Sequence, residues 1–406
     1  MGNSFLSKHV SGMPASATMA TAAIAAEYVK NQVVHYNWGL GEPDGGMQPH
    51  LREAGQRAFA EGKTKYTPPN GILPFREAIS EFFSGFGLAY KPGAIIVGNG
   101  SKGVLFNIFL ATLNPGDEVI VPNPRWVSYE PMIIYVGGKM VTVEPGQDFK
   151  ITPAALEAAI TDKTKWFLFN NPSNPSGAVY TLEEQKALGE VFRQHPDVMI
   201  LTDEMYWSFN YTDQPFVPFA VANPDLYDRV VTTNGLAKSH AMTGLRIGFA
   251  GAPNTPDGQG LVDTANKIQG NIAGNPNTVS QWVTIAAIRG DQSFLNAQRE
   301  LFIDRRDAMV KGLNAAGLPC GTPDGAFYVM PNVAHLIGGR TPSGVTLVDD
   351  VAVTQFFAKE AKVIGVPGSA FGLPETIRFA YPVDRDTNII PGAWALGEAV
   401  RKLENV

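Results

Sequence analysis

Lys238 is the residue whose surroundings most suggest covalent chemistry. It follows the apolar run Val230-Val231-Thr232 and precedes Arg246 in a stretch rich in small residues. A lysine at the end of a buried strand is either a solvated charge or a desolvated amine, and desolvation makes it a nucleophile that forms Schiff bases. Arg246 could clamp a phosphate with its fork of donors. Taken alone, a solvated lysine is the simpler interpretation, so the catalytic one needs support from other residues.

Asp203 ends a second apolar run, residues 198–202, and Tyr206 follows it. A carboxylate at the end of a buried strand is costly unless a cation pairs with it. A protonated heterocyclic nitrogen would be such a cation. The alternative is that Asp203 is an ordinary helix N-cap.

A rigid turn, residues 170–177, comes directly after an expected strand that ends at Phe169. Its two Asn-Pro steps restrict the backbone, and X-Pro bonds are where cis peptides occur. Such a turn at the carboxyl end of a strand can aim a side-chain amide into the crevice where open α/β sheets bind ligands. A purely structural loop is the alternative.

Three glycines and Lys102 gather in residues 98–103, between an expected strand and an expected helix. Gly100, Ser101 and Lys102 would let backbone amides at a helix N-terminus approach a phosphate. The spacing fits G-x-G-x-x-G, but the nearest acids, Asp117 and Glu118, precede their strand rather than end it. The segment therefore suits a phosphate better than a nicotinamide dinucleotide, with a simple tight turn as the alternative.

Arg378 lies in a β-rich run, on the strand face opposite Ile377 and Phe379. It could bind a carboxylate through two hydrogen bonds, or it could face solvent. The six histidines lack metal-ligand spacing and no G-x-S-x-G elbow is present, so we predict neither metal-dependent nor serine-dependent hydrolysis.

The elements that must position these residues alternate between helix and strand from about residue 50 to 290. Apolar strands are expected at 94–97, 118–121, 165–169, 198–201 and 230–232. Helices are expected at 52–61, 75–83 and 101–113, from Thr152-Pro153, and from Thr181, which forms a capping box with Glu184. Strands that are apolar on both faces predict a parallel sheet covered by helices. After Phe294 the pattern changes and predicts a smaller α+β domain, while residues 13–26 predict an amphipathic helix.

Composition limits the class of protein. The 406 residues suggest two or three domains, and 44% apolar with 17% charged residues allows a large core. A net charge of −6 is too mild to predict a nucleic-acid or membrane surface, and no apolar run is long enough to span a bilayer. The single Cys320 cannot form an internal disulfide, so a reducing cytoplasm is the default location.

The order of these motifs resembles the class I/II aminotransferases of PLP fold type I, and the stretch around Lys238 is similar to their bacterial aspartate aminotransferase-like subgroup. The resemblance rests on Leu40-Gly41-Glu42-Pro43-Asp44, Tyr66-Thr67-Pro68, Gly100-Ser101-Lys102, Trp126-Val127-Ser128-Tyr129, the Asn-Pro turn, Asp203 with Tyr206, Lys238 through Arg246, Gly325-Ala326-Phe327-Tyr328, and Arg378.

The resemblance implies a large α/β domain, residues 51–292, with a mostly parallel seven-stranded sheet. It implies a smaller α+β domain built from residues 1–50 and 293–406, and a homodimer with shared active sites. The implied reaction moves an amino group between an L-amino acid, with aspartate-like substrates favoured, and a 2-oxo acid such as 2-oxoglutarate, by a ping-pong route with pyridoxal 5'-phosphate (PLP). Elimination or cyclisation with the same cofactor, or non-enzymatic ligand sensing, are the alternatives.

The resemblance also implies a role for each site residue. Lys238 would bind PLP and move the substrate proton, Asp203 would face the ring nitrogen, and Tyr206 with Asn174 would contact the ring hydroxyl. The remaining cofactor contacts would be Gly100, Ser101, Lys102, Arg246, a stacked Trp126, and Tyr66 from the partner subunit. Substrate contacts would be Arg378, Asn174, Gly41 and Trp38.

Overall fold

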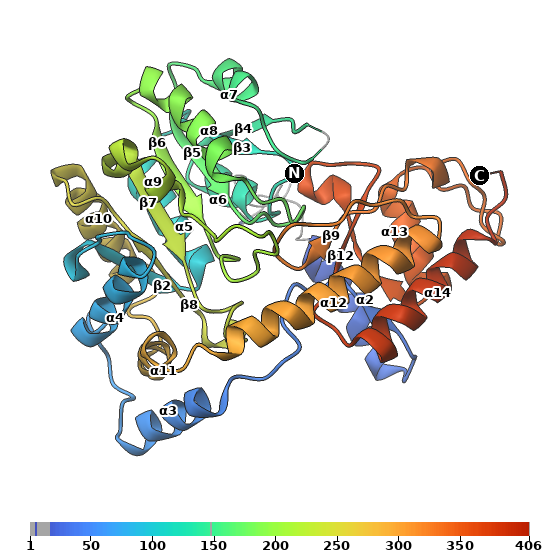
Figure 1. Ribbon diagram of the computed structural model, residues 1–406, viewed down its shortest axis with the longest axis horizontal. Coiled ribbons are helices and arrows are strands. Elements are labelled where there is room, and N and C mark those ends of the chain that lie inside the picture. The colour runs from blue at the N-terminus through green and yellow to red at the C-terminus, as the bar shows by residue number, and fades with distance from the viewer. Residues whose placement is uncertain (1–4, 6–16, 147, 406) are drawn as a thin grey trace.

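The computed structural model describes residue 5, residues 17–146 and residues 148–405. A larger body with a wide sheet and a smaller body with short strands lie side by side, and the long helix α12 (Phe294–Ala315) runs from one to the other (Figure 1). Functional residues from distant parts of the chain can therefore meet between two separately packed cores.

The larger body is built on a seven-stranded sheet. In the order β2-β8-β7-β6-β5-β3-β4, its strands are β2 (Ile95–Asn99), β8 (Ile247–Gly251), β7 (Val230–Asn234), β6 (Met199–Asp203), β5 (Thr164–Asn170), β3 (Glu118–Pro122) and β4 (Lys139–Val143). Strand β8 is antiparallel to both neighbours, and the pairs from β7 to β4 are parallel. Parallel strands end at one edge, and the register places Asn170 opposite Asp203 there.

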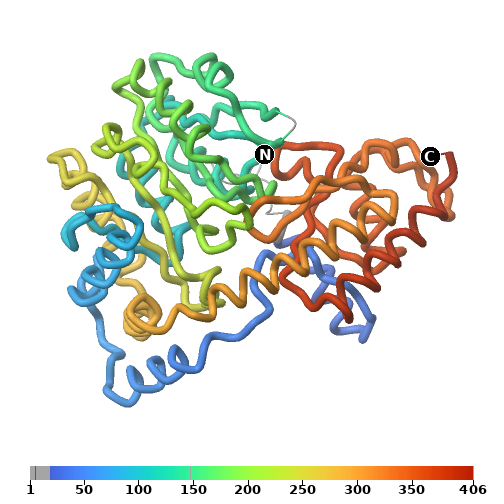
Figure 2. Tube along the Cα trace, in the orientation of Figure 1, coloured from blue at the N-terminus to red at the C-terminus, as the bar shows by residue number. Residues whose placement is uncertain are grey.

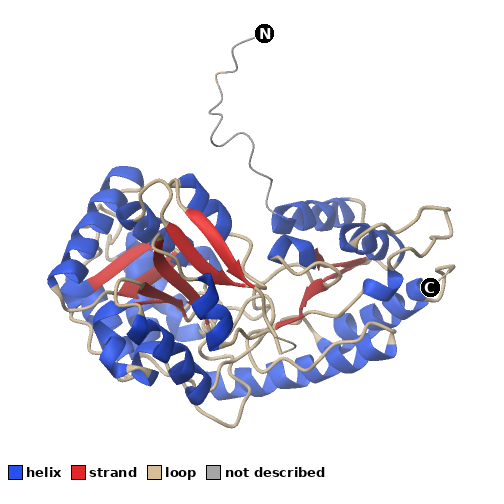
Figure 3. Cartoon of the chain, turned by 90° about the horizontal axis from the view of Figure 1, so that it is seen from above, coloured by secondary structure: helices blue, strands red, loops and turns tan. Residues whose placement is uncertain are grey.

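Helices cover both faces of this sheet, as Figure 3 shows from above. They are α3 (Pro49–Ala60), α4 (Leu73–Ser84), α5 (Ser101–Thr112), α6 (Tyr129–Tyr135), α7 (Pro153–Ala159), α8 (Leu182–Gln194), α9 (Phe219–Ala222), α10 (Pro256–Ile272) and α11 (Thr278–Arg289). Alternate residues of one strand join different cores: Val97 packs in one cluster and Ile96 in the other. This two-sided burial confirms the predicted helix-covered, mostly parallel sheet.

The smaller body combines the N-terminal segment with the C-terminal part of the chain. Helix α2 (Ala17–Lys30) leads into β1 (Tyr36–Asn37), which pairs in parallel with β10 (Val363–Ile364), and Figure 2 shows this blue segment beside the red end of the chain. A three-stranded antiparallel sheet has the order β11 (Val366–Pro367), β12 (Ile377–Ala380), β9 (Tyr328–Val329), with α13 (Asp350–Glu360) and α14 (Ile390–Val400). Short helical turns complete the fold: η1 (Pro92–Ala94), η2 (Pro224–Arg229), η3 (Thr243–Leu245), η4 (Ala334–Leu336), η5 (Gly368–Phe371) and the π-helical η6 (Arg385–Ile389).

The predicted elements form with small shifts at their ends, including the capping box of α8, in which Thr181 and Glu184 each cap the other's backbone. Strands β4 and β8 were not predicted, because β4 is only partly buried and β8 contains two glycines, which weaken a strand signal. The predicted helix at 13–26 corresponds to α2, and residues 13–16 lie outside the described residues. The domain limits 51–292 and 293–406 stay a prediction.

Candidate active site

A cavity of about 380 Å³ lies at the carboxyl edge of the sheet, where the two bodies meet. Its walls come from the ends of β5 and β6, from the segment that follows β7, from the start of α5, and from α2 and β12 of the smaller body. Most of the predicted site residues line it: Gly41, Gly100, Ser101, Lys102, Trp126, Asn174, Asp203, Tyr206, Lys238, Arg246 and Arg378.

Asp203 is the last residue of β6 and is buried. Its carboxylate accepts a hydrogen bond from the Tyr129 hydroxyl at 2.8 Å and one from the Met205 amide at 3.3 Å. Burial raises the pKa of Asp203, while these donors and the nearby Lys238 oppose the rise. The hydrogen-bonding partners are neutral, so the site favours a further cation beside this carboxylate.

Lys238 follows β7 and reaches into the same cavity. Burial lowers the pKa of Lys238 to about 8; Glu42 opposes this shift and Arg378 adds to it. Its Nζ atom donates to the Gly41 carbonyl at 2.5 Å. At pH 7 an amine with this pKa is neutral in about a tenth of the molecules, compared with roughly one in three thousand for an ordinary lysine, and the neutral form is the one that a lysine nucleophile needs.

The start of α5 forms a cationic cradle. Gly100 has φ +79°, and a Cβ there would lie only 2.4 Å from Nη2 of Arg246, so the guanidinium rests directly against the glycine backbone. Burial lowers the pKa of Lys102, and Arg246 lowers it further. The Ser101 hydroxyl is buried without a hydrogen-bond partner. Clustered cations, an unsatisfied hydroxyl and the free amides of a helix's first turn together suit a bound anion.

Arg378 lies on β12, is 2% exposed, and enters the cavity from the smaller body. Its Nη2 donates to the Gly39 carbonyl at 2.8 Å and its Nη1 to the Asn174 amide oxygen at 3.2 Å. Its guanidinium lies 4.5 Å from the Tyr328 ring centroid. This buried cation has neutral hydrogen-bond partners, an arrangement that suits a carboxylate ligand.

Asn174 also links to the tyrosines of the cavity. Its Nδ2 donates to the Tyr206 hydroxyl at 3.4 Å, and that hydroxyl lies 2.8 Å from the Tyr328 hydroxyl. Both Asn-Pro bonds of the turn are cis. The three polar groups thus face the interior together.

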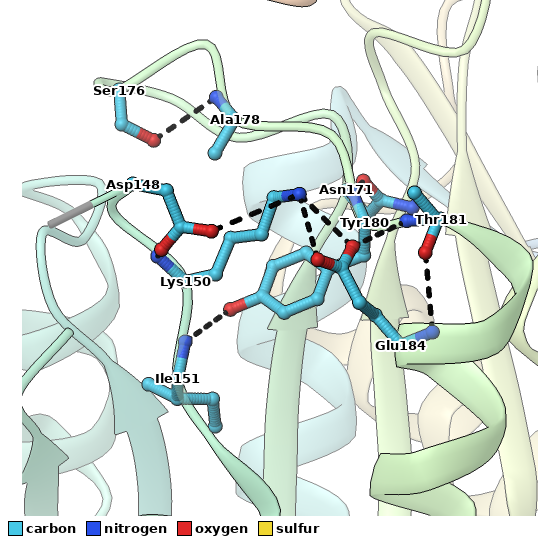
Figure 4. Close-up of polar contacts among 9 residues, drawn as sticks. All are labelled: Asp148, Lys150, Ile151, Asn171, Ser176, Ala178, Tyr180, Thr181 and Glu184. Carbon is cyan, nitrogen blue, oxygen red and sulfur yellow. Dashed lines mark hydrogen bonds and ion pairs between the residues drawn. The ribbon is translucent and has the colours of Figure 1, made fainter. Parts of the chain in front are cut away.

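The turn that carries Asn174 is braced from behind by a polar cluster (Figure 4). The Tyr180 amide donates to Oδ1 of Asn171 at 3.0 Å, which closes the turn. Lys150 pairs with Glu184 at 2.9 Å and lies 5.8 Å from the Tyr180 ring centroid. These contacts hold the base of the turn and leave the Asn174 side chain directed at the cavity.

Two predicted contacts are not brought to this cavity. Trp38 is wrong as a substrate contact: its side chain is fully buried in the smaller core, packs edge-on against Phe379 at 5.2 Å, and donates from Nε1 to Asn388 at 2.7 Å. Its indole satisfies its polar atom away from the cavity, which explains a structural position. Tyr66 is 97% exposed and lines a different surface groove.

Tyr129 and Tyr328 are cavity residues that the sequence interpretation gave no role. Tyr129 hydrogen-bonds Asp203 and packs edge-on against Trp126 at 5.3 Å. Its position three residues after Trp126, on one face of a helical turn, was the available signal. Trp126 itself lies beneath Lys102, whose Nζ is 5.1 Å from the ring centroid.

Within the part of the chain that the structure describes, no three His, Cys, Asp or Glu side chains are grouped to hold a metal ion. The described helices include none that is long and apolar enough to cross a bilayer.

The cavity at the sheet edge combines a lysine of lowered pKa, a buried aspartate, an anion cradle and a buried arginine. These groups define an enzyme that works through an amine on carboxylate-bearing substrates. The family model for aminotransferase class I and II matches residues 34–389, and the chain belongs to this family. It is therefore an aminotransferase.

Named relatives agree with this assignment. The aspartate/prephenate aminotransferase of Cereibacter sphaeroides is 42% identical over 381 residues, which is 93% of this chain and 94% of the relative. The crystal structure of the aspartate aminotransferase from Rhizobium meliloti has a TM-score of 0.92 at 37% identity, covering 98% of this chain and 99% of that one. The Thermus thermophilus aspartate aminotransferase with maleate has a TM-score of 0.88 at 35% identity, covering 97% and 99%.

Proposed function

We propose that this aminotransferase uses PLP attached through Lys238 and exchanges an amino group between an aspartate-like L-amino acid and a 2-oxo acid such as 2-oxoglutarate. The observation that carries the proposal is the meeting of Lys238, Asp203 and Arg378 in one cavity. An amine, an acid and a carboxylate-binding cation are the groups that amine transfer needs, and they come from three distant parts of the chain.

The residues present fit PLP. The unpartnered Ser101 hydroxyl, the bare backbone of Gly100 and the guanidinium of Arg246 would hold the phosphate, with Lys102 beside them. The Asp203 carboxylate, which has only neutral hydrogen-bond donors among the described contacts, would pair with a protonated ring nitrogen.

Aromatic and amide groups would complete the cofactor contacts. Tyr206 and Asn174, already hydrogen-bonded to each other, would contact the ring hydroxyl. Trp126, on the cavity wall, would stack on the ring.

When bound, PLP supplies an electron sink that stabilises negative charge at the substrate's Cα. Lys238 would hold the cofactor covalently, and its Nζ, once free, would take the proton that the substrate's Cα loses and later give it back. The Gly41 carbonyl, which accepts a hydrogen bond from Nζ, would keep the amine over the reacting atoms. Asp203 would pair with the protonated ring nitrogen and so would keep the cofactor in the form that draws electrons.

Arg378 would orient the substrate through its α-carboxylate, assisted by Asn174 and the Gly41 backbone. Lys102 lines the same cavity beside the phosphate cradle, so a side-chain carboxylate on the substrate would find a cation there in addition to Arg378. Two cations for two carboxylates support an aspartate-like substrate, in keeping with the names of the relatives.

A homodimer with shared sites would give Tyr66 its role. Tyr66 is 97% exposed in the single chain, and Phe59, which lines the same groove, is 66% exposed. Large exposed apolar side chains around a groove mark a surface that a partner covers. A second copy there would bring Tyr66 to the neighbouring phosphate cradle.

The single thiol, Cys320, is compatible with the cytoplasm.

A donor and acceptor panel tests the proposal. The purified enzyme with PLP is assayed with L-aspartate and other L-amino acids, with and without 2-oxoglutarate, and Lys186→Ala serves as the matched control for Lys238→Ala. We expect product formation that requires the acceptor and is fastest with dicarboxylic donors. Turnover without an acceptor would favour the elimination or cyclisation alternative, and no turnover with any donor would favour the sensor.

A further inference from the structure

Arg305, on the inter-body helix α12, makes a two-pronged ion pair with Asp44. Its Nη1 and Nη2 atoms each donate to a different carboxylate oxygen of Asp44 at 2.8 Å. The Arg305 side chain is 7% exposed and that of Asp44 is 39% exposed. Fork-to-fork pairs of this kind fix orientation as well as distance.

The loop that ends at Asp44 supplies backbone contacts to the cavity. The Gly39 carbonyl accepts from Arg378, and the Gly41 carbonyl accepts from Nζ of Lys238. Glu42 accepts a hydrogen bond from the Thr243 hydroxyl. Both cations of the proposed mechanism are thus held by carbonyls of one short loop.

This loop needs an anchor at Asp44, because the chain beyond it is permissive. Two of the contacting residues are glycines, and after Asp44 come Gly45 and Gly46, which are exposed and around which a Cβ would meet no atom within 4 Å. Upstream, Trp38 fixes the chain through backbone bonds to Ile364 and Ala380. Arg305 fixes the other end from outside the cavity.

We propose that Arg305 is a positioning residue that acts through Asp44, setting where the Gly39 and Gly41 carbonyls meet Arg378 and Lys238. The inference rests on the proposed function and deepens it, since it places part of the catalytic precision in a pair remote from the chemistry. Asp44 is held firmly, because moving it away would leave the buried guanidinium of Arg305 without a counterion.

The test compares Asp44→Asn with a matched control on α12, the helix that carries Arg305. Asp304, which pairs with Arg385 at 2.9 Å on the surface, provides Asp304→Asn. Each variant is examined for PLP content, thermal unfolding midpoint, kcat, KM and the equilibrium Kd for maleate. The kinetic and binding measurements are made at a temperature well below the unfolding midpoint of each variant. We expect Asp44→Asn to keep PLP and to bind maleate more weakly. Its kcat/KM should fall about tenfold or more, with both kcat and KM affected, because a displacement of about 1 Å in a positioning group can lower the rate about 10²-fold. The control should stay within about twofold of the parent.

A double-mutant cycle with Arg305→Gln sharpens the result. If Arg305 and Asp44 act as one pair, the double variant loses no more kcat/KM than the more impaired single variant. Arg305→Lys, which keeps the charge, then retains more kcat/KM than Arg305→Gln. Normal kcat, KM and maleate binding in Asp44→Asn, with only a lower midpoint, would overturn the inference. If the parent itself transfers no amino group, the proposed function fails instead. Should Arg305→Gln not fold, Asp44→Asn alone still decides.

Discussion

At the scale of single residues, burial shifts the two titratable groups of the cavity toward their neutral forms. It raises the pKa of Asp203 and lowers the pKa of Lys238 to about 8, and each group partly offsets the shift of the other. A neutral Asp203 could not form an ion pair, but a cationic ligand beside it would lower its pKa and restore the negative charge. The neutral amine of Lys238 is the reactive form, so the same burial that penalises one group prepares the other.

The lowered pKa of Lys238 predicts how cofactor capture depends on pH. Below about 8 the amine is an unreactive ammonium, and above it the amine is neutral, whereas an ordinary lysine changes near 10.5. We expect the rate at which the cofactor-free chain attaches PLP to rise with pH and to level off above about 8, measured by absorbance. Nα-acetyllysine in the same buffers is the control. A rate that keeps rising toward 10.5 would contradict the desolvated amine.

The buried fork of Arg378 predicts a substrate-binding defect in Arg378→Lys. Lysine keeps the charge but cannot donate to Asn174, Gly39 and a carboxylate from one plane. We expect KM for the amino acid to rise about 10- to 100-fold, the equivalent of 1.5–3 kcal/mol for a charge-assisted hydrogen bond, with PLP content unchanged. Arg340→Lys, at an exposed arginine, is the control. Loss of PLP in place of substrate affinity would show that Arg378 serves the cofactor.

At the scale of elements, the carboxyl ends of β5, β6 and β7 and the start of α5 collect the site at one sheet edge. This much follows from the sequence, because apolar strands that each end in a polar residue must place those residues together in a parallel sheet. Residues 98–103, 170–177, 203 and 238 were predicted on that basis, and the members that line the cavity are Gly100, Ser101, Lys102, Asn170, Asn174, Asp203 and Lys238.

The contributions of the smaller body were harder to predict. The face of Arg378 on β12 does not by itself distinguish a buried cation from a solvent-facing one; its burial depends on the packing of Tyr328 and Phe371 against it. Trp38 was misassigned for the same reason, because its contacts with Phe379 and Asn388 come from elements far along the chain. Long-range packing, not local pattern, decided these positions.

The close approach at the start of α5 predicts the effect of Gly100→Ala. A Cβ would lie 2.4 Å from Arg246, and the φ of +79° disfavours any side chain. We expect PLP to bind about tenfold or more weakly, since about 1–3 kcal/mol of backbone strain and a displaced guanidinium act at the phosphate contact. Equilibrium dialysis measures this. Gly103→Ala, whose nearest neighbour would be 3.8 Å away, is the matched control, and equal PLP affinity in both variants would refute the cradle.

At the scale of the whole molecule, the exposed Tyr66 predicts that each site is completed by a second copy. Lys238→Ala and Tyr66→Ala chains would each be impaired alone, but a mixed dimer would contain one site with both residues intact. After unfolding and joint refolding of equal amounts, we expect about a quarter of the parent activity, because half of the dimers are mixed and each has one complete site. Activity no greater than the average of the two separate variants would mean that Tyr66 serves its own chain.

The central claim, that a cofactor held by Lys238 in this cavity transfers an amino group, is tested most directly by a half-reaction. The PLP-loaded enzyme is mixed with L-aspartate and no acceptor, while the visible absorption and the released 2-oxo acid are followed together. We predict one change of absorption and one equivalent of 2-oxo acid for each site, full reversal on adding 2-oxoglutarate, and neither event in Lys238→Ala. Continuous release of product without an acceptor, or an unchanged half-reaction in Lys238→Ala, would contradict it.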